Sequence, residues 1–231
     1  MNYFDFKQFR IEQDRCAMKV GTDGVLLGAW AGGGRRILDI GTGTGLIALM
    51  MAQRFPDAAL TAIDIDGEAC LQARQNVLAS LFADRVEVVH SSLQDFHAEN
   101  RFDSIVSNPP FFEHSLKNPD ARKSVARHVD TLPFSDLFDG VSRLLGDDGV
   151  FSVIVPKDNL ERFCPNAYLS GFYFHRKIKV KTTVRKPAKR CLLAFGKHAP
   201  EVLENDEICL QNDDGNRSAW YQNLTQDFYL R

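Results

Sequence analysis

The sequence lacks the features that mark several classes of protein. Its five cysteines form no Cys-x-x-Cys pair and are too scattered for a disulfide framework or a zinc site. No apolar run approaches the roughly 20 residues that span a bilayer, and residues 1–7 lack the apolar core of a signal peptide. The formal net charge is -2, so no overall field marks a nucleic-acid binder. We therefore expect a cytoplasmic protein that binds no metal and no membrane.

What the chain does contain is an alternation of strand-like and helix-like segments. Short apolar stretches predict strands at 36–40, 59–63, 86–89, 102–106 and 150–155. Apolar residues at helical spacing predict helices at 46–55, 67–81, 137–145 and 158–168. Two β-rich runs, 173–183 and 190–195, follow with only a turn between them. This order predicts one α/β domain over residues 1–231, with a mainly parallel seven-stranded sheet, one antiparallel strand and helices on both faces.

A glycine-rich loop joins the first predicted strand to the first predicted helix. It reads Asp39-Ile40-Gly41-Thr42-Gly43-Thr44-Gly45, and its glycines allow positive φ and the close approach of a ligand. In open α/β sheets, ligands bind beyond the carboxyl ends of the strands. The dinucleotide fingerprint requires glycine or alanine where this chain has Leu46. The spacing instead resembles the first motif of class I S-adenosylmethionine (SAM)-dependent methyltransferases, whose fold is Rossmann-like.

This resemblance implies that SAM is the cofactor. It places Gly41, Gly43 and Gly45 behind the amino-acid part of SAM, and the strand-end acid Asp39 helps to hold the site. The second strand ends in Ala62-Ile63-Asp64-Ile65-Asp66. An acid there can accept hydrogen bonds from both ribose hydroxyls, and we assign this role to Asp64, whereas Asp66 is expected to cap the following helix. A tight turn beside a surface acid would give the same pattern.

A second motif, Ser107-Asn108-Pro109-Pro110-Phe111-Phe112, follows the fourth strand. Its prolines end strand pairing and stiffen the turn, which fixes Asn108 at the carboxyl end of the strand, next to SAM. The Asn108 amide and the Pro109 carbonyl can accept hydrogen bonds from a planar amino group, and Phe111 can stack on a base. In-line methyl transfer then relies on positioning rather than on a strong general base.

The predicted catalytic residues are therefore Asn108, Pro109, Pro110 and Phe111, and Asn108 is also counted among the residues that contact SAM. The motif resembles the Asn/Asp-Pro-Pro-aromatic signature of amino methyltransferases, which act on adenine N6, guanine N2 or the amide of glutamine. A structural proline turn with an accidental asparagine is the alternative interpretation.

The segment before the first strand, 16–30, reads as a loop that leads into a helix capped by Thr22 or Asp23. In this position, residues 1–30 suit a segment that packs over the cofactor, with Lys19 near the methionine carboxylate and with Gly21 and Thr22 in the same site. Four stretches, 6–9, 14–24, 107–112 and 224–230, resemble the bacterial tRNA1(Val) (adenine-37-N6)-methyltransferase family. The resemblance extends over nearly the whole chain and implies N6-methylation of an adenine next to the anticodon of a valine tRNA.

The sequence departs from these patterns in two places. Many class I enzymes carry an acid after the third strand that meets the SAM adenine, whereas this chain has Ser92 there. The adenine contact is therefore expected from Ser92, Asp95 or the backbone. Some members of the family have tyrosine in place of Phe111, and either ring can stack.

Cations cluster near the carboxyl terminus. Charge alternates with apolar residues along 173–183, which places several cations on one face of a strand, and more follow in the next turn. Such a patch suits RNA phosphates, but a lysine-rich edge strand also blocks unwanted pairing, and both interpretations stay open. The candidate RNA-binding residues are Arg176, Lys177, Lys179, Lys181, Arg185, Lys186, Lys189 and Arg190. A second basic group, Arg122, Lys123, Arg127 and His128, is expected near the substrate or on solvated surface.

We predict a SAM-dependent methyltransferase that acts on adenine N6 in tRNA as a monomer. Three alternatives stay open. Enzymes that methylate guanine N2 in ribosomal RNA use the same motif but tend to carry a duplicated domain, for which this chain is too short. Enzymes that methylate a glutamine amide carry an extra helical amino-terminal domain, which this sequence lacks. A non-catalytic SAM- or RNA-binding module would not need Asn108 and Pro109.

Overall fold

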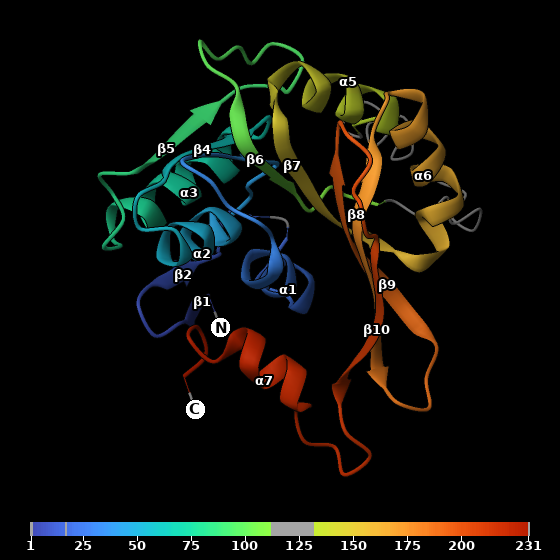
Figure 1. Ribbon diagram of the computed structural model, residues 1–231. Coiled ribbons are helices and arrows are strands. Elements are labelled where there is room, and N and C mark those ends of the chain that lie inside the picture. Colours follow the sequence, from blue (N-terminus) through green and yellow to red (C-terminus); the bar gives the residue numbers. More distant parts are fainter. Residues whose placement is uncertain (1, 17, 112–131, 231) are drawn as a thin grey trace, which may run out of the picture.

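The computed structural model describes residues 2–16, 18–111 and 132–230. Its central sheet contains β3 (Arg36–Ile40), β4 (Ala59–Asp64), β5 (Val86–His90), β6 (Phe102–Ser107), β7 (Leu145–Pro156), β8 (Tyr173–Thr183), β9 (Ala188–Gly196) and β10 (Glu204–Gln211). The spatial order is β10-β8-β9-β7-β6-β3-β4-β5 (Figure 1). Only β9 runs antiparallel to its neighbours in this described sheet. The predicted mainly parallel sheet with one antiparallel strand is confirmed.

The count of seven strands is wrong, because β10 adds an eighth. This strand pairs in parallel with β8 at the edge of the sheet, from Glu204 opposite Arg176 to Gln211 opposite Thr183. Its first four residues are polar and exposed, and only Ile208 and Leu210 are buried. The alternation that identifies a half-buried strand is therefore too short to be recognised in the sequence.

Helices cover both faces of the sheet, as predicted (Figure 1). One face, the α1–α3 face, packs against α1 (Thr22–Trp30), α2 (Leu46–Arg54), α3 (Gly67–Leu78) and α7 (Ala219–Thr225). The other, the α5–α6 face, packs against α5 (Phe134–Leu144) and α6 (Leu160–Leu169), which follows the short 3-10 helix η1 (Lys157–Asn159). The α3 helix ends at Leu78 rather than at Leu81, because Ser80 turns the chain by bonding the Val77 carbonyl through its amide and its hydroxyl.

The two ends of the chain are joined by a small second sheet that the sequence did not predict. Strands β1 (Tyr3–Asp5) and β2 (Arg10–Glu12) form an antiparallel hairpin. The tail after α7 closes on it, since Phe6 forms a β-bridge with Tyr229 and the Lys7 amide donates to the Phe228 carbonyl at 2.8 Å. The ring of Phe6 stacks on that of Tyr229. Figure 1 shows both termini together beside α7.

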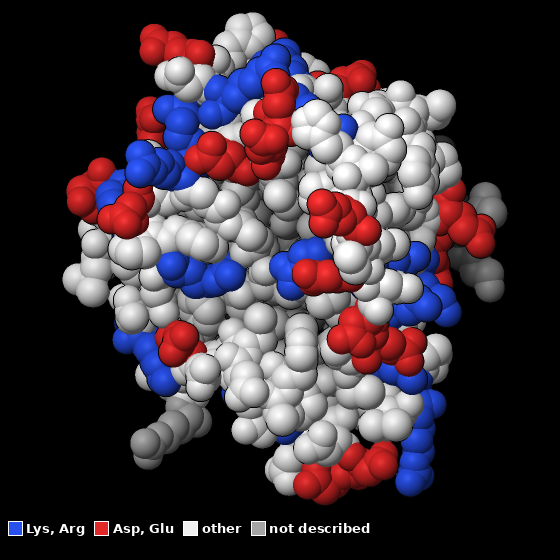
Figure 2. Space-filling model, in the orientation of Figure 1, with Lys and Arg blue, Asp and Glu red and all other residues white. Residues whose placement is uncertain are grey.

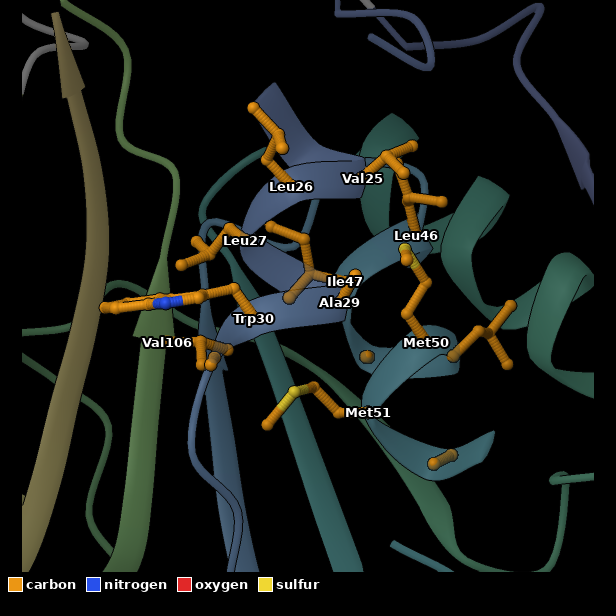
Figure 3. Close-up of a cluster of buried hydrophobic side chains, with 14 of the residues drawn as sticks. Val25, Leu26, Leu27, Ala29, Trp30, Leu46, Ile47, Met50, Met51 and Val106 are labelled. Carbon is orange, nitrogen blue, oxygen red and sulfur yellow. The ribbon is translucent and has the colours of Figure 1, made fainter. Parts of the chain in front are cut away.

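Helix α1 lies directly on α2, which carries the glycine loop at its amino end. Buried residues of α1 and α2 belong to one core cluster, in which Val25 of α1 lies beside Leu46 of α2, whereas the Trp30 ring points away from α2 toward β6 (Figure 3). Arg54 of α2 caps the carboxyl end of α1, because its side chain donates hydrogen bonds to the carbonyls of Gly28 at 3.0 Å and Ala31 at 2.7 Å. Glycine at position 28 is required by this contact, because a Cβ there would lie 2.9 Å from the Met50 Cβ.

Replacing Gly28 with alanine should lower the free energy of unfolding by about 1–3 kcal/mol, because the Met50 Cβ is not a flexible side-chain end that can swing away. Gly32→Ala is the matched control, since a Cβ at position 32 meets nothing within 4 Å, and its stability should stay within a few tenths of a kcal/mol or rise. Urea unfolding checks both variants. Equal stability of Gly28→Ala and the parent protein would contradict the tight packing of α1 on α2.

Candidate active site

Three motifs that are far apart in the sequence meet at the carboxyl edge of the sheet. Ile40, the last residue of β3, pairs with Ile63 of β4 on one side and with Ser107 of β6 on the other. The glycine loop, Asp64 and Asn108 follow these three residues directly. The chain order of the motifs and their spatial order thus agree with a ligand site at the carboxyl ends of parallel strands.

The glycine loop has the backbone that its sequence predicts. Gly41, Gly43 and Gly45 have φ of 71, 57 and 83 degrees, a region that side chains with a Cβ rarely adopt. A Cβ built on Gly41 or Gly43 meets nothing within 4 Å, whereas one on Gly45 would contact Ala73 of α3 at 3.4 Å. The first two glycines therefore border open space, in which a ligand can approach the backbone closely, and Gly45 serves helix packing.

Asp39, at the end of β3, is a buried carboxylate with one unused oxygen. Its Oδ2 accepts from the Thr42 hydroxyl at 2.6 Å and from the Ala48 amide at 3.2 Å. Its buried Oδ1 has no hydrogen-bond partner in the described part of the chain. Burial raises the pKa of Asp39 to about 7, and the two hydrogen bonds oppose this rise. A buried acceptor without a partner is uncommon and fits a site that receives a donor from a ligand.

Asp64 is half-buried and is held by two backbone amides. Its Oδ2 accepts from the Gly43 amide at 2.8 Å, and its Oδ1 accepts from the Asp66 amide at 3.0 Å. Each carboxylate oxygen can accept a further hydrogen bond, so the group keeps its capacity for a diol. Asp66 is the N-cap of α3 and accepts from the Glu68 amide at 2.9 Å, which confirms the predicted cap.

The Asn-Pro-Pro-Phe turn leaves β6 beside this site. Ser107 fixes the start of the turn, because its buried hydroxyl donates to the Ile40 carbonyl at 2.9 Å. Asn108 is partly exposed, Pro109 is buried and Pro110 is exposed. The last residue of the motif, Phe112, lies outside the described residues.

Phe111 has aromatic neighbours of its own. Its ring centroid lies 5.8 Å from that of Phe134 at the start of α5 and 6.4 Å from that of Phe163 in α6. The ring is only partly exposed. The sequence shows an aromatic residue in the right position for stacking, but it does not show that this ring is supported from the α5–α6 face.

The amino-terminal segment lies beside the same edge. Gln72 and Asn76 of α3 hold it, since Gln72 Oε1 accepts from the Arg15 amide at 3.1 Å and Asn76 Oδ1 accepts from the Glu12 amide at 2.9 Å. Burial and the negative charges of Asp64 and Asp66 raise the pKa of the Cys16 thiol to about 11. Gln72 and Asn76 were not among the predicted site residues, although the spacing of two amide side chains on one face of the predicted helix was visible in the sequence.

The start of α1 differs from the prediction. Lys19, Gly21 and Thr22 are exposed, and Gly21 is the N-cap, with no side-chain cap. The Asp23 carboxylate does not cap the helix because it forms an ion pair with Arg190 of β9 instead. Burial raises the pKa of Asp23, and Arg190 opposes the rise.

The hydroxyl of Ser92 is engaged in a local turn. It donates to Asp95 Oδ2 at 2.7 Å and accepts from the Asp95 amide at 3.1 Å. The neighbouring Ser91 amide donates to the Asp64 carbonyl at 3.0 Å, which keeps this turn next to the acid of β4. The contact to the SAM adenine stays a prediction.

Half of the candidate RNA-binding cations have carboxylate partners. The ion pairs are Arg176–Glu204 at 2.7 Å, Lys181–Glu207 at 2.8 Å, Arg185–Asp213 at 3.7 Å and Arg190–Asp23. Within the described residues, the remaining cations form no ion pair; they are Lys177, Lys179, Lys186 and Lys189. On the face shown in Figure 2, acidic and basic side chains are interspersed. The second basic group, 122–128, lies outside the described residues.

Solved structures with the same architecture define the class of the fold. The structure resembles a predicted O-methyltransferase from Agrobacterium tumefaciens, with a TM-score of 0.68, 18% identity, and coverage of 89% of this chain and 96% of that one. It also resembles a putative class I SAM-dependent methyltransferase from Listeria monocytogenes, with a TM-score of 0.58, 16% identity, and coverage of 80% and 62%. The fold is that of the class I methyltransferases, as predicted.

Sequence relatives narrow the assignment. The model of the methyltransferase small domain matches residues 23–131. The tRNA1(Val) (adenine(37)-N6)-methyltransferase of Phocaeicola vulgatus is 49% identical over 230 residues, which are 99% of this chain and 97% of the relative. The enzyme of the same name from Bacteroides thetaiotaomicron is 44% identical over 99% of this chain and 97% of its own. The chain belongs to the tRNA1(Val) (adenine(37)-N6)-methyltransferase family, and the resemblance drawn from the sequence is confirmed.

Two further features are absent from the part of the chain that the structure describes. No helix among them is long and apolar enough to cross a membrane. The same part of the chain holds no group of three or more His, Cys, Asp and Glu side chains that could bind a metal ion.

The raised pKa of Asp39 predicts a pH-dependent stability. The unfolded carboxyl titrates near its ordinary value of 3.8, so the native state binds more protons between about pH 4 and about pH 7. The free energy of unfolding should therefore fall as pH rises through this window. Asp39→Asn removes the titrating group and should remove this part of the decline. Urea unfolding of both proteins across the window measures the difference, and parallel curves would contradict the assignment.

Proposed function

We propose that this protein transfers the methyl group of SAM to N6 of adenine 37 in tRNA1(Val). The observation that carries the proposal is the placement of Asn108-Pro109 beside the glycine loop, at one edge of the sheet. The full-length similarity to enzymes of that name supports the choice of adenine and of this tRNA. The five cysteines are free, which supports a cytoplasmic protein, and we expect it to act as a monomer.

We assign the cofactor site to the residues around the glycine loop. The open space at Gly41 and Gly43 and the unpartnered oxygen of Asp39 fit the amino-acid part of SAM. The Asp64 carboxylate accepts from the ribose hydroxyls, and Ser92 lies near the adenine. Lys19, Gly21 and Thr22 approach the methionine carboxylate from the amino-terminal segment, which packs over the site. SAM, when bound, supplies an electrophilic methyl group.

Asn108 and Pro109 orient the amine that receives the methyl group. The lone pair of an exocyclic amine is delocalised into the ring, so the amine is a weak nucleophile. The Asn108 side-chain oxygen and the Pro109 carbonyl accept hydrogen bonds from the two N–H groups, which favours a geometry with the lone pair free for attack. Because the methylated amine is a strong acid, its proton leaves without a dedicated base, and positioning supplies most of the rate.

The prolines and Phe111 keep these acceptors in place. Pro109 and Pro110 remove two backbone donors and restrict the turn, so that the acceptors do not need to be ordered when the substrate binds. Phe111, which is supported by Phe134 and Phe163, offers its remaining exposed surface to the base. Lys186 and Lys189, in and beside the turn between β8 and β9, provide phosphate contacts at the same end of the molecule.

The activity is tested by methylating total bacterial tRNA with radiolabelled SAM and analysing the nucleosides. N6-methyladenosine should carry the label, and it should map to position 37 of tRNA1(Val). Label in N2-methylguanosine or in protein would overturn the proposal in favour of one of the other amino acceptors.

Asn108→Ala should lower kcat by at least about 100-fold, because one of the two acceptors is lost from the transition state. SAM affinity, measured by calorimetry, should change little. Asn100→Ala, in an exposed loop before β6, is the matched control and should retain full activity. Loss of SAM binding in Asn108→Ala with an unaltered turnover of bound substrate would contradict the role given to Asn108.

Asp64→Ala should weaken SAM binding by at least about 10-fold, because hydrogen bonds to a charged group contribute about 1.5–3 kcal/mol each. Asp66→Ala is the matched control: it removes the cap of α3 and lowers stability by about 1 kcal/mol but leaves the ribose contact intact. Calorimetric titration with SAM separates the two. An unchanged SAM affinity in Asp64→Ala would rule out the ribose assignment.

A further inference from the structure

Lysine side chains gather on the α5–α6 face of the central sheet, on β8 and next to the carboxyl end of β7. Lys177 and Lys179 of β8 lie opposite Leu193 and Cys191 of β9, whose buried side chains belong to the core of that face. Because opposed residues of an antiparallel pair point to the same side, both lysines stand on the α5–α6 face. Arg176 points to the other face, where its guanidinium lies over the Trp30 ring.

Lys157 joins this group from a different element. It begins η1 directly after β7, and Val155 of β7 also pairs with Cys191. Burial raises the pKa of the Cys191 thiol, and the positive charges of Lys177, Lys179 and Lys157 oppose the rise. Lys179 and Val155 thus lie on either side of Cys191 in the sheet, with Lys177 and Lys157 two residues away along their own segments. Lys157 was not among the predicted RNA-binding residues, because in the sequence it stands alone between Pro156 and Asp158.

One carboxylate faces this group. Glu207 of β10 lies opposite Lys179 and forms its ion pair with Lys181 at 2.8 Å, and the positive charges of Lys181, Lys179 and Lys157 lower its pKa. Asp158 and Glu161, on η1 and α6, are exposed and form no ion pair within the described residues. Lys157 and Lys179 are exposed, and Lys177 is half-buried. Because Glu207 is shared among these lysines, positive charge remains in excess, and its repulsion costs free energy that an anionic partner would offset.

The group lies at the same edge of the sheet as the catalytic turn. Ser107, the last residue of β6, pairs with Val153 of β7, and β7 ends shortly beyond this pair at Pro156. The Asn-Pro-Pro-Phe turn and Lys157 therefore leave the sheet at its carboxyl edge. The α6 helix, which follows η1, carries Phe163, whose ring centroid lies 6.4 Å from that of Phe111 in the turn.

We propose that Lys157, Lys177 and Lys179 form a phosphate-binding surface for the RNA strand that carries the target adenine. Lys157 contacts the phosphates nearest the base, and Lys179 and Lys177 hold the strand farther from it. The cations with carboxylate partners, Arg176, Lys181 and Arg190, maintain the protein structure instead. This inference rests on the proposed tRNA substrate and adds the path of its backbone across the protein.

A lysine of this group and an arginine at the opposite edge of the sheet provide the test. Lys179→Ala should weaken binding of a tRNA1(Val) transcript and reduce the slope of log K against log salt by about 0.7–0.9, the value for one phosphate contact. The triple variant Lys157→Ala, Lys177→Ala, Lys179→Ala should reduce it by about 2–3. Arg101→Ala, at the amino end of β6, removes a cation that is paired with Asp147 and should leave the slope unchanged, and Lys179→Arg should restore it. Fluorescence anisotropy over a range of KCl concentrations measures all four.

Binding is measured without SAM, so the result does not depend on whether adenine 37 is methylated by the parent protein. Calorimetry with SAM and thermal unfolding show that the variants are folded, and their SAM affinity should equal that of the parent. An unaltered salt slope in the triple variant would overturn the proposal. An equal loss in Lys179→Ala and Arg101→Ala would also overturn it, because net charge alone would then explain the binding.

Discussion

The carbonyl of Ile63 accepts hydrogen bonds from the amides of Gly41 and Thr42, at 2.9 and 3.0 Å. These bonds tie the loop after β3 to the end of β4, at the place where the sheet itself stops pairing. They require the chain to turn at once, which only glycine does easily with φ of 71 degrees at position 41. The next residue of β4 is Asp64, whose carboxylate bonds the Gly43 amide. Loop and acid are thus fixed relative to each other by consecutive residues.

The rest of the site is arranged around this turn. Because β4 holds the loop, the amino end of α2 lies against Asp39 and buries it. The Asp39 Oδ1 then has no hydrogen-bond partner among the described residues. The Ser107 hydroxyl donates to the Ile40 carbonyl, which fixes the Asn-Pro-Pro-Phe turn to the end of the same strand. The amino-terminal segment is held by Gln72 and Asn76 of α3, a helix that also packs against Gly45. The proposed cofactor site and the proposed acceptor site therefore both depend on the junction between β3 and its two neighbouring strands.

Sequence reasoning was effective where function depends on local backbone chemistry. Glycines at a strand end, an acid at the next strand end and two prolines after an asparagine each have few structural explanations, and the topology of parallel strands then brings them together. Predictions from the sequence were wrong where a residue or strand interacts with a partner that is distant in the sequence. Strand β10 has little apolar alternation of its own and exists because β8 pairs with it. Asp23 could have capped α1, but Arg190 captures its carboxylate from 167 positions along the chain. The cations of β8 could not be divided into paired and unpaired ones for the same reason. Their positions are visible in the sequence, but the acids of β10 that pair with some of them are not recognisable as neighbours.

The pairing of Phe6 with Tyr229 has a consequence for synthesis. Phe6, next to the hairpin of β1 and β2, is synthesised long before Tyr229, its β-bridge partner, because the whole central sheet lies between them in the sequence. Strands of a few residues are marginal on their own, so the hairpin gains part of its stability only after Tyr229 has been added. The central sheet can therefore form before the hairpin has all of its contacts.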